Sequence, residues 1–333
     1  MSDDAKPGPA AARRSGPETL SPSQKDPRVI GVSDTQSFTW RDRLIDCLAR
    51  ILICLALILP YRARVPMMGW LMRRVVGPVI GARARVINNL AHIWPDMPAF
   101  ETRQIATAVL DNTGRILIEN YSTSALLARA EAWEPKGPGL TALAEAQATG
   151  RPVLLITGHF GNYEAARAAL TVRGYSIGGL YRPMNNGYFN RHYVRTMESF
   201  GGPVFPRGPK GLRGFVRHLK QGRQGVLLID QYFATGALLD YLGKPAPTST
   251  SAAEIALKYD AALIPFYATR LKNGLDFEVA LEAPVAHSDA ITMTQALNDS
   301  LSAKVRDNPA QWFWLHRRWK PERQARHFEQ SES

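Results

Sequence analysis

The stretch PVLLITGHFGNYE, residues 152–164, decides how the rest of the chain is arranged. Its apolar run VLLIT predicts a short buried strand, which the following glycine ends. Asn162 is a good N-cap for the alanine-rich segment 163–172, so we expect a helix there. A strand, a tight turn and a helix in this order place His159 at the carboxyl edge of a sheet, where open α/β sheets bind their ligands.

His159 is the candidate catalytic base, and Glu164 is the candidate acid that supports it. A carboxylate five residues away and in the first helical turn is expected to reach one imidazole nitrogen, fix the tautomer and make the other nitrogen a better base. The surrounding sequence offers no nucleophile, so the nucleophile would be a hydroxyl of the substrate. The alternative is an ordinary surface pair or a buried core histidine. Gly158 and Gly161 favour a site, because glycines let a ligand approach the backbone.

The segment from His159 to Glu164 resembles the HxxxxE signature of the lipid A late acyltransferases, within the lysophospholipid acyltransferase superfamily. Further blocks of that family follow in the same order: Tyr181-Arg182-Pro183, Asp230-Gln231 and WLHRRWK at 314–320. The resemblance covers roughly residues 40–320. It implies an O-acyltransferase of lipopolysaccharide biosynthesis that moves a fatty acyl chain from an acyl carrier protein thioester to a hydroxyl of a phosphorylated lipid A precursor. It also implies an N-terminal membrane helix and a catalytic domain on the cytoplasmic side of the inner membrane.

Two other functions stay open. The nearer is an acyltransferase of the same superfamily that acts on a lysophospholipid or a lyso-aminolipid; these glycerolipid enzymes carry HxxxxD, so Glu164 favours the lipid A branch. The more distant is a non-catalytic, membrane-associated lipid-binding protein.

The chain is strongly basic, with a formal net charge of +12 over 333 residues and a sequence pI near 9.9. Such a surface favours phosphates, anionic lipid or an acidic partner such as acyl carrier protein. Nucleic acid is the rival partner, but the sequence has no lysine-rich runs and no known nucleic-acid-binding motif. We therefore expect anionic inner-membrane lipid and no nucleic acid. Cys47 and Cys54 lie seven apart on one expected helix and should not pair, which indicates a reducing compartment.

Three parts are expected along the chain: a disordered tail (1–37), a membrane-anchoring helix (38–60) and an acyltransferase domain (61–325). The tail is rich in Pro, Ser, Gly and charge. The anchor has aromatic and arginine residues at one end and apolar residues at the other, but it is shorter than the ~20 apolar residues of a span. A shallow anchor, a marginal span and a core helix remain alternatives. Residues 62–94 predict two basic amphipathic helices with a break near Gly77-Pro78, which would rest on anionic headgroups or form a solvated face.

The remaining chain alternates strands with helices, which predicts an α/β fold with a mostly parallel central sheet flanked by helices, like the glycerolipid acyltransferases. Beyond the opening strand, strands are expected at 175–181, 203–205, 225–230, 263–269 and 277–281. Helices are expected at 98–127, 139–149, 163–172, 187–200, 211–220, 249–259 and 292–306.

Substrate-binding residues are expected at the strand ends. Arg182 carries a planar fork for phosphate or carboxylate, and the loop from Arg207 to Lys210 opens a helix and suits an anion. Asp230 could orient the site. Donors near Gly161 and Asn162 would stabilise an oxyanion.

The tryptophan-rich end, 312–320, is typical of a membrane interface or of a lipid phosphate contact. It contains His316, a rival catalytic histidine that lacks a carboxylate at useful spacing. No metal-binding pattern and no nucleotide fingerprint is present, so we expect neither a metal nor another cofactor.

Overall fold

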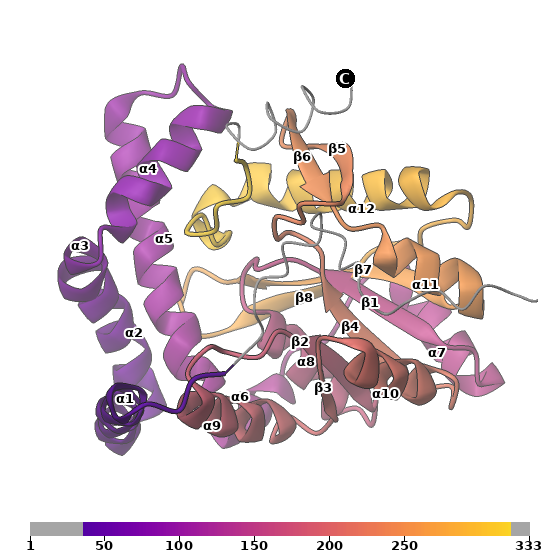
Figure 1. Cartoon of the computed structure of the whole chain (residues 1–333), viewed down its shortest axis with the longest axis horizontal. Helices are drawn as coiled ribbons and strands as arrows, with labels where there is room; N and C mark the ends of the chain where they lie inside the picture. The colour runs from indigo at the N-terminus through magenta and orange to yellow at the C-terminus, as the bar shows by residue number, and fades with distance from the viewer. Residues whose placement is uncertain (1–35, 321–333) are drawn as a thin grey trace, which may run out of the picture. The chain divides into compact units, whose positions relative to one another are not determined.

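A computed structural model describes residues 36–320 (Figure 1). The predicted tail, 1–37, falls almost entirely outside the described residues, as do residues 321–325 of the predicted acyltransferase domain. In chain order, the helices and strands are α1 Trp40–Ile58, α2 Tyr61–Leu71, the π-helix η1 Met72–Val76, α3 Gly77–Val79, α4 Ala82–Ile93, α5 Ala99–Asn120, α6 Thr123–Ala130, α7 Gly139–Thr149, β1 Val153–Thr157, α8 Tyr163–Thr171, β2 Ile177–Tyr181, α9 Gly187–Glu198, β3 Val204–Pro206, α10 Pro209–Leu219, β4 Gln224–Leu228, β5 Ala237–Tyr241, β6 Lys244–Thr248, α11 Ser251–Tyr259, β7 Ala262–Arg270, β8 Phe277–Leu281, α12 Ala290–Asp307 and the 3₁₀ turn η2 Pro309–Gln311.

The central sheet has the strand order β3-β2-β4-β1-β7-β8. All neighbouring strands run parallel except β8, which pairs antiparallel with β7. The predicted α/β fold with a mostly parallel sheet is therefore confirmed. Because β1 lies between β4 and β7, the loops that follow β1 and β4 meet at one edge of the sheet.

Helices cover both faces of this sheet, and β1 contributes to both cores because alternate strand residues point to opposite faces. Leu154 and Ile156 belong to the core with α10, α11 and α12, whereas Val153 and Leu155 belong to the core with α6, α7 and α8. All five residues of β1 are buried. This double burial explains why the strand reads as a continuous apolar run.

Apart from shifts of a few residues at the ends of elements, three features differ from the sequence-based expectation. The helical break expected at Gly77-Pro78 occurs instead at Gly81, which has φ +65° and ends the preceding turn in the left-handed region. The helix expected at 98–127 is two helices, α5 and α6, separated at Tyr121-Ser122. The antiparallel β5–β6 hairpin was not predicted.

The N-terminal helices form a layer of their own beside the sheet domain (Figure 1). Its centre is the contact between α2 and α5, where Gly114 lets the helices approach closely: a Cβ there would lie 2.2 Å from the Met68 carbonyl oxygen. The expected helix at 38–60 is present as α1, which Thr39 caps. Within residues 36–320, every helix falls short of the length and hydrophobicity needed to cross a bilayer.

Candidate active site

The turn between β1 and α8 is built by one asparagine and one glycine. The Asn162 side-chain oxygen accepts hydrogen bonds from the backbone N–H of Glu164 (3.0 Å) and Ala165 (3.3 Å), as predicted for a helix cap. Gly161 has φ +54°, and a Cβ at this position would lie 1.7 Å from the Ala268 carbonyl oxygen. The turn therefore packs directly on β7 and tolerates no side chain at residue 161.

The sheet register brings His159 to the level of Asp230. Thr157 pairs with Leu228 across the β1–β4 ladder, so the residues two positions beyond each strand end face one another. His159 Nδ1 lies 2.8 Å from Asp230 Oδ1, and the His159 backbone N–H donates to Asp230 Oδ2 at 2.7 Å. Gly158 makes room for this pair, since a Cβ there would lie 2.9 Å from Asp230 Oδ2.

A third donor completes the environment of the Asp230 carboxylate. Trp312 Nε1–H donates to Asp230 Oδ2 at 2.8 Å. Burial acts to raise the pKa of Asp230, but the charge and hydrogen bonds of His159, together with the nearby His316, outweigh it and hold the pKa below its usual range. An ionised carboxylate only accepts hydrogen bonds, so His159 Nδ1 carries a proton and Nε2 keeps a free lone pair.

The His159 imidazole is accessible to solvent, whereas the Asp230 carboxylate is not. The His159 side chain is 21% exposed and the Asp230 side chain 0%. Three rings flank the imidazole, with centroid distances of 5.8 Å to Tyr163, 6.1 Å to Phe313 and 4.6 Å to His316. This arrangement is suited to removing a proton from a group that approaches His159 from solvent.

His316 packs edge-on against His159 but is differently placed. Its buried Nε2 has no hydrogen-bond partner among the described residues. Burial lowers the pKa of His316 to about 4, and the neighbouring His159 acts in the same direction. The Asp230 carboxylate is hydrogen-bonded to His159 and not to His316. We therefore retain His159 as the base and regard His316 as a neutral neighbour.

The expectation that Glu164 contacts the imidazole is wrong in the structure. The buried Glu164 carboxylate forms an ion pair with Arg167, with Oε2 3.1 Å from Nη1. Burial raises the pKa of Glu164, and the Arg167 charge opposes the rise. The cause is the phase of the helix: residues 164 and 167 lie one turn apart on the buried face of α8, so Glu164 pairs along its own helix.

The expected oxyanion donors at Gly161 and Asn162 are also occupied. The backbone N–H of Gly161 donates to the Gln311 carbonyl at 2.9 Å, and that of Asn162 to the Ala268 carbonyl at 3.2 Å. The Asn162 side-chain Nδ2 donates to Glu119 Oε2 at 3.0 Å. Buried polar groups need such partners, so these donors hold the turn in place and are not available to a substrate.

The cationic candidates lie at the carboxyl edge that also carries His159. Arg182 follows β2 directly, and the Arg207 backbone N–H donates to the Tyr181 carbonyl at 2.7 Å. The Arg207 guanidinium lies over the Phe233 ring at 5.4 Å, and Lys210 lies in the first turn of α10. Their role in binding phosphate stays a prediction.

The tryptophan-rich end is part of the core and not an interfacial belt. Trp312, Trp314 and Trp319 are all buried, and Trp312 stacks edge-on against Trp314 with ring centroids 4.7 Å apart. Arg318 is buried too and donates to the Pro247 carbonyl and to Thr248 Oγ1, both at 2.5 Å. This segment therefore joins the β5–β6 hairpin to the active site.

Sequence reasoning missed the buried residues that hold the turn after β1 in place. Glu119 and Arg270 form a buried pair at 2.5 and 2.7 Å, and Glu119 also holds Asn162. Trp312 was predicted to lie at a membrane interface or a lipid phosphate, and its hydrogen bond to Asp230 was missed. Among residues 36–320, no group of three His, Cys, Asp or Glu side chains could hold a metal ion.

A mostly parallel α/β sheet with a carboxylate-supported histidine at its edge is suited to general-base chemistry on a bound ligand. The chain belongs to the bacterial lipid A biosynthesis acyltransferase family, whose sequence profile matches residues 34–321. Family membership supports an acyltransferase of lipid A synthesis.

Curated relatives agree at low identity. A lipid A biosynthesis acyltransferase of Haemophilus influenzae is 26% identical over 265 residues, which cover 76% of this chain and 81% of the relative. A second one from the same organism is 23% identical over 243 residues, 70% and 74% of the two chains. The lipid A biosynthesis lauroyltransferase of Escherichia coli is 24% identical over 245 residues, 72% and 79% of the two chains.

Proposed function

We propose that the protein transfers a fatty acyl chain from an acyl carrier protein thioester to a hydroxyl of a phosphorylated lipid A precursor. The observation that carries this proposal is the His159–Asp230 pair, in which a partly exposed base is held by a fully buried acid. Family membership supplies the reaction class.

The reaction begins at His159 Nε2, which takes the proton of the acceptor hydroxyl while the oxygen attacks the thioester carbonyl. Asp230 stabilises the imidazolium that forms, as the orienting acid of a catalytic triad does. The carbon–sulfur bond then breaks, and the imidazolium returns its proton to the departing sulfur. The products are the new ester and the free carrier thiol, and no group outside the two substrates is consumed.

Arg182, Arg207 and Lys210 are proposed to bind the phosphates of the acceptor. They follow β2 and β3, which lie in the same mostly parallel sheet as β1, the strand that His159 follows. A guanidinium fork pairs with phosphate oxygens in two-point fashion. The excess of basic residues, +12 in net charge, favours the approach of an acidic carrier protein.

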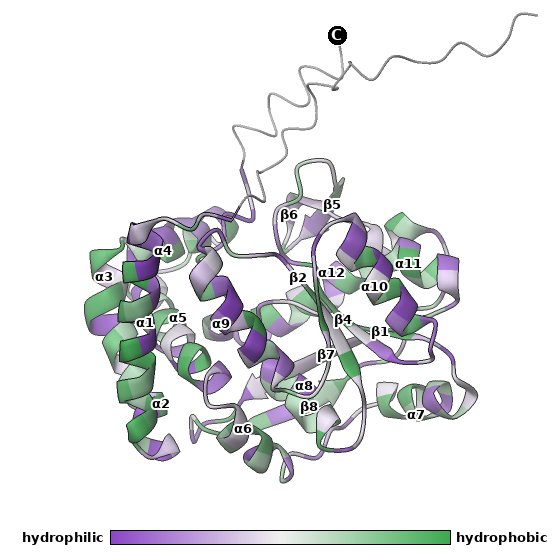
Figure 2. Ribbon diagram, turned by 60° about the horizontal axis from the view of Figure 1, so that its bottom comes forward, coloured by the Kyte–Doolittle hydropathy of each residue, from purple (hydrophilic) through white to green (hydrophobic). Residues whose placement is uncertain are grey.

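We also propose that the protein works at the cytoplasmic face of the inner membrane. One long surface of α1 consists of exposed apolar side chains: Leu44, Ile45, Leu48, Ile51, Leu52, Leu55 and Ile58. In Figure 2, α1 and the neighbouring helices α2 and α3 carry much of the green that marks hydrophobic residues. An exposed apolar helix face of this extent is typical of attachment to a lipid surface.

The test is an assay with defined acyl thioesters and a labelled lipid A precursor. The wild type should form the acylated product, and His159→Ala should lose about 100-fold or more of the rate, because a general base has been removed. Lysophospholipid acceptors serve as the comparison. Acylation of a lysophospholipid but not of the precursor would refute the choice of acceptor, and a fully active His159→Ala variant would refute the mechanism.

A further inference from the structure

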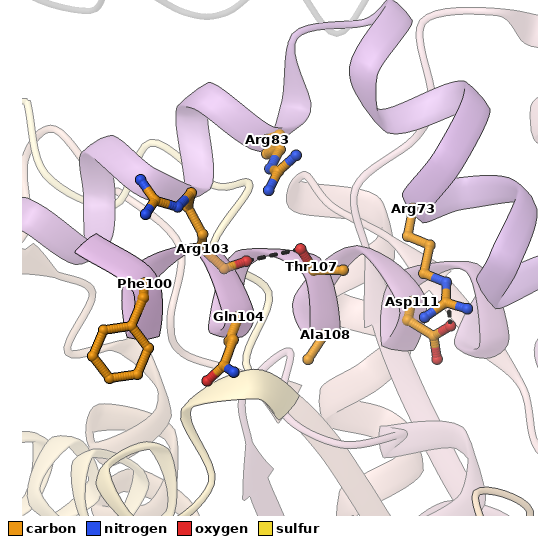
Figure 3. A pocket seen from close by; sticks show the side chains of 8 residues that line it. All are labelled: Arg73, Arg83, Phe100, Arg103, Gln104, Thr107, Ala108 and Asp111. Carbon is orange, nitrogen blue, oxygen red and sulfur yellow. Dashed lines mark hydrogen bonds and ion pairs between the residues drawn. The ribbon is translucent and has the colours of Figure 1, made fainter. Parts of the chain in front are cut away.

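A pocket lined by arginines lies outside the candidate active site, between α4 and α5. A pocket of about 570 Å³ opens there, and none of its lining residues contacts His159 or Asp230. Three arginines line it: Arg73 from η1, Arg83 from α4 and Arg103 from α5. In Figure 3, Arg83 and Arg103 extend into the space between the two helices. The pocket is therefore built from elements that the catalytic chemistry does not use.

The charges in this pocket do not balance. Asp111 is the acidic residue that lines it, and Asp111 is bound by Arg115 and by Arg73, whose Nε lies 3.6 Å from Oδ1. Arg83 and Arg103 make no side-chain hydrogen bond or ion pair with the described part of the chain. Two guanidinium groups thus face one opening without a counter-charge, which is the arrangement that binds a phosphate.

An exposed apolar helical turn, residues 75–80, lies between two of these arginines in the chain. Val75, Val76, Val79 and Ile80 lie between Arg73 and Arg83 in the chain, and all four are exposed, Val79 to 82%. Free phosphate would make no use of such a turn. A lipid would, because its headgroup would lie in the pocket while its hydrocarbon covers the valines and the isoleucine.

We propose that this pocket binds the phosphate of an anionic membrane glycerolipid through Arg83 and Arg103, with the turn 75–80 inserted among the acyl chains. The proposal rests on the membrane association proposed above and is independent of acyl transfer. According to this proposal, the N-terminal helices bind a specific lipid headgroup in addition to making hydrophobic contact with the membrane.

The experiment is flotation of the full chain with vesicles of phosphatidylcholine, with or without about 30 mol% phosphatidylglycerol, at fixed ionic strength. The wild type should bind the anionic vesicles about tenfold or more tightly than the neutral ones. The double variant Arg83→Gln/Arg103→Gln should lose most of that preference, since each phosphate–guanidinium contact is charge-assisted. Both arginines are exposed, so the variant should fold, and thermal unfolding should be measured to check this.

The matched control is Arg213→Gln/Arg217→Gln, which removes the same charge from the exposed face of α10. It should keep the preference for anionic vesicles. Equal loss in both double variants would overturn the proposal in favour of general charge attraction, as would equal wild-type binding to both vesicles. Complete release by millimolar inorganic phosphate would overturn the lipid in favour of a free-phosphate site. Acyl transfer assayed in detergent should be unchanged in Arg83→Gln/Arg103→Gln; failure of the wild type there, with vesicle binding intact, would refute only the proposed function.

Discussion

Replacing Asp230 by asparagine should disable His159 without changing the shape of the site. Asp230 Oδ2 accepts two N–H donors, from the His159 backbone and from Trp312, so the amide oxygen must occupy that position. The amide NH₂ then replaces Oδ1 and points at His159 Nδ1. Two donors cannot face each other, so the imidazole proton must move to Nε2, and Nε2 can no longer accept the proton of the substrate.

The magnitude follows from two losses. A mismatched buried hydrogen bond costs about 1–3 kcal/mol, and the imidazolium formed during the reaction loses the charge that stabilises it. Together they amount to about 3–5 kcal/mol, which at about 1.4 kcal/mol per decade lowers kcat about 10²- to 10⁴-fold. KM should change little, because Asp230 is fully buried and does not reach the substrate.

The assay is the steady-state rate of acyl transfer from a defined thioester, with kcat and KM determined separately and folding checked by thermal unfolding. Asp230→Glu serves as a second variant, since it keeps the charge but displaces it by one methylene. A folded Asp230→Asn protein with the wild-type kcat would show that the Asp230 carboxylate does not support the base, and the mechanism would have to be abandoned.

Three further perturbations separate catalytic from structural roles. Glu164→Gln should lower stability by about 3–5 kcal/mol, since it leaves the buried Arg167 guanidinium without its counter-charge. Activity per folded molecule should stay within about tenfold of the wild type; a folded variant as inactive as Asp230→Asn would return the catalytic role to Glu164. Trp312→Phe removes one hydrogen bond from the Asp230 carboxylate and should lower kcat by about tenfold with KM unchanged; an unaltered kcat would make the indole a packing residue only. The pKa of His316 is about 4 in the folded chain, against an ordinary value of 6.5. Between these pH values the unfolded chain therefore binds more protons than the folded chain. The stability that depends on a neutral His316 is fully present above pH 6.5 and is lost as the pH falls towards 4. After allowance for partial exposure this loss is about 2 kcal/mol. Urea unfolding at pH 7 and pH 4 should show that the free energy of unfolding falls by about 2 kcal/mol less in His316→Gln than in the wild type. An equal fall in the two proteins would contradict the assignment.

The fold could be predicted because its strands and helices are written in local patterns. The apolar run at 153–157 and the Asn162 cap define a strand and a helix without reference to the rest of the chain. The β5–β6 hairpin could not be predicted in this way. Its second strand is KPAPT, and Pro245 and Pro247 argue against a strand unless the missing N–H groups face away from the partner, as they do in a two-stranded ribbon.

The site was predicted in part for a related reason. The sequence placed His159 and Asp230 at the same edge of the sheet, but only the pairing of Thr157 with Leu228 shows that they are level and in contact. Glu164 was chosen because it is close in sequence, and the helix turns it away from His159. The tryptophans were ambiguous, since an indole suits both a buried core and a lipid interface, and composition alone cannot choose between them.

The indole of Trp312 has a consequence for biosynthesis. During translation, His159 and Asp230 are synthesised well before Trp312, which donates a hydrogen bond to the Asp230 carboxylate. A nascent chain, or a fragment released before residue 312, would carry the reactive imidazole without its final support. We therefore expect the polypeptide to reach its full rate only after translation has passed residue 312.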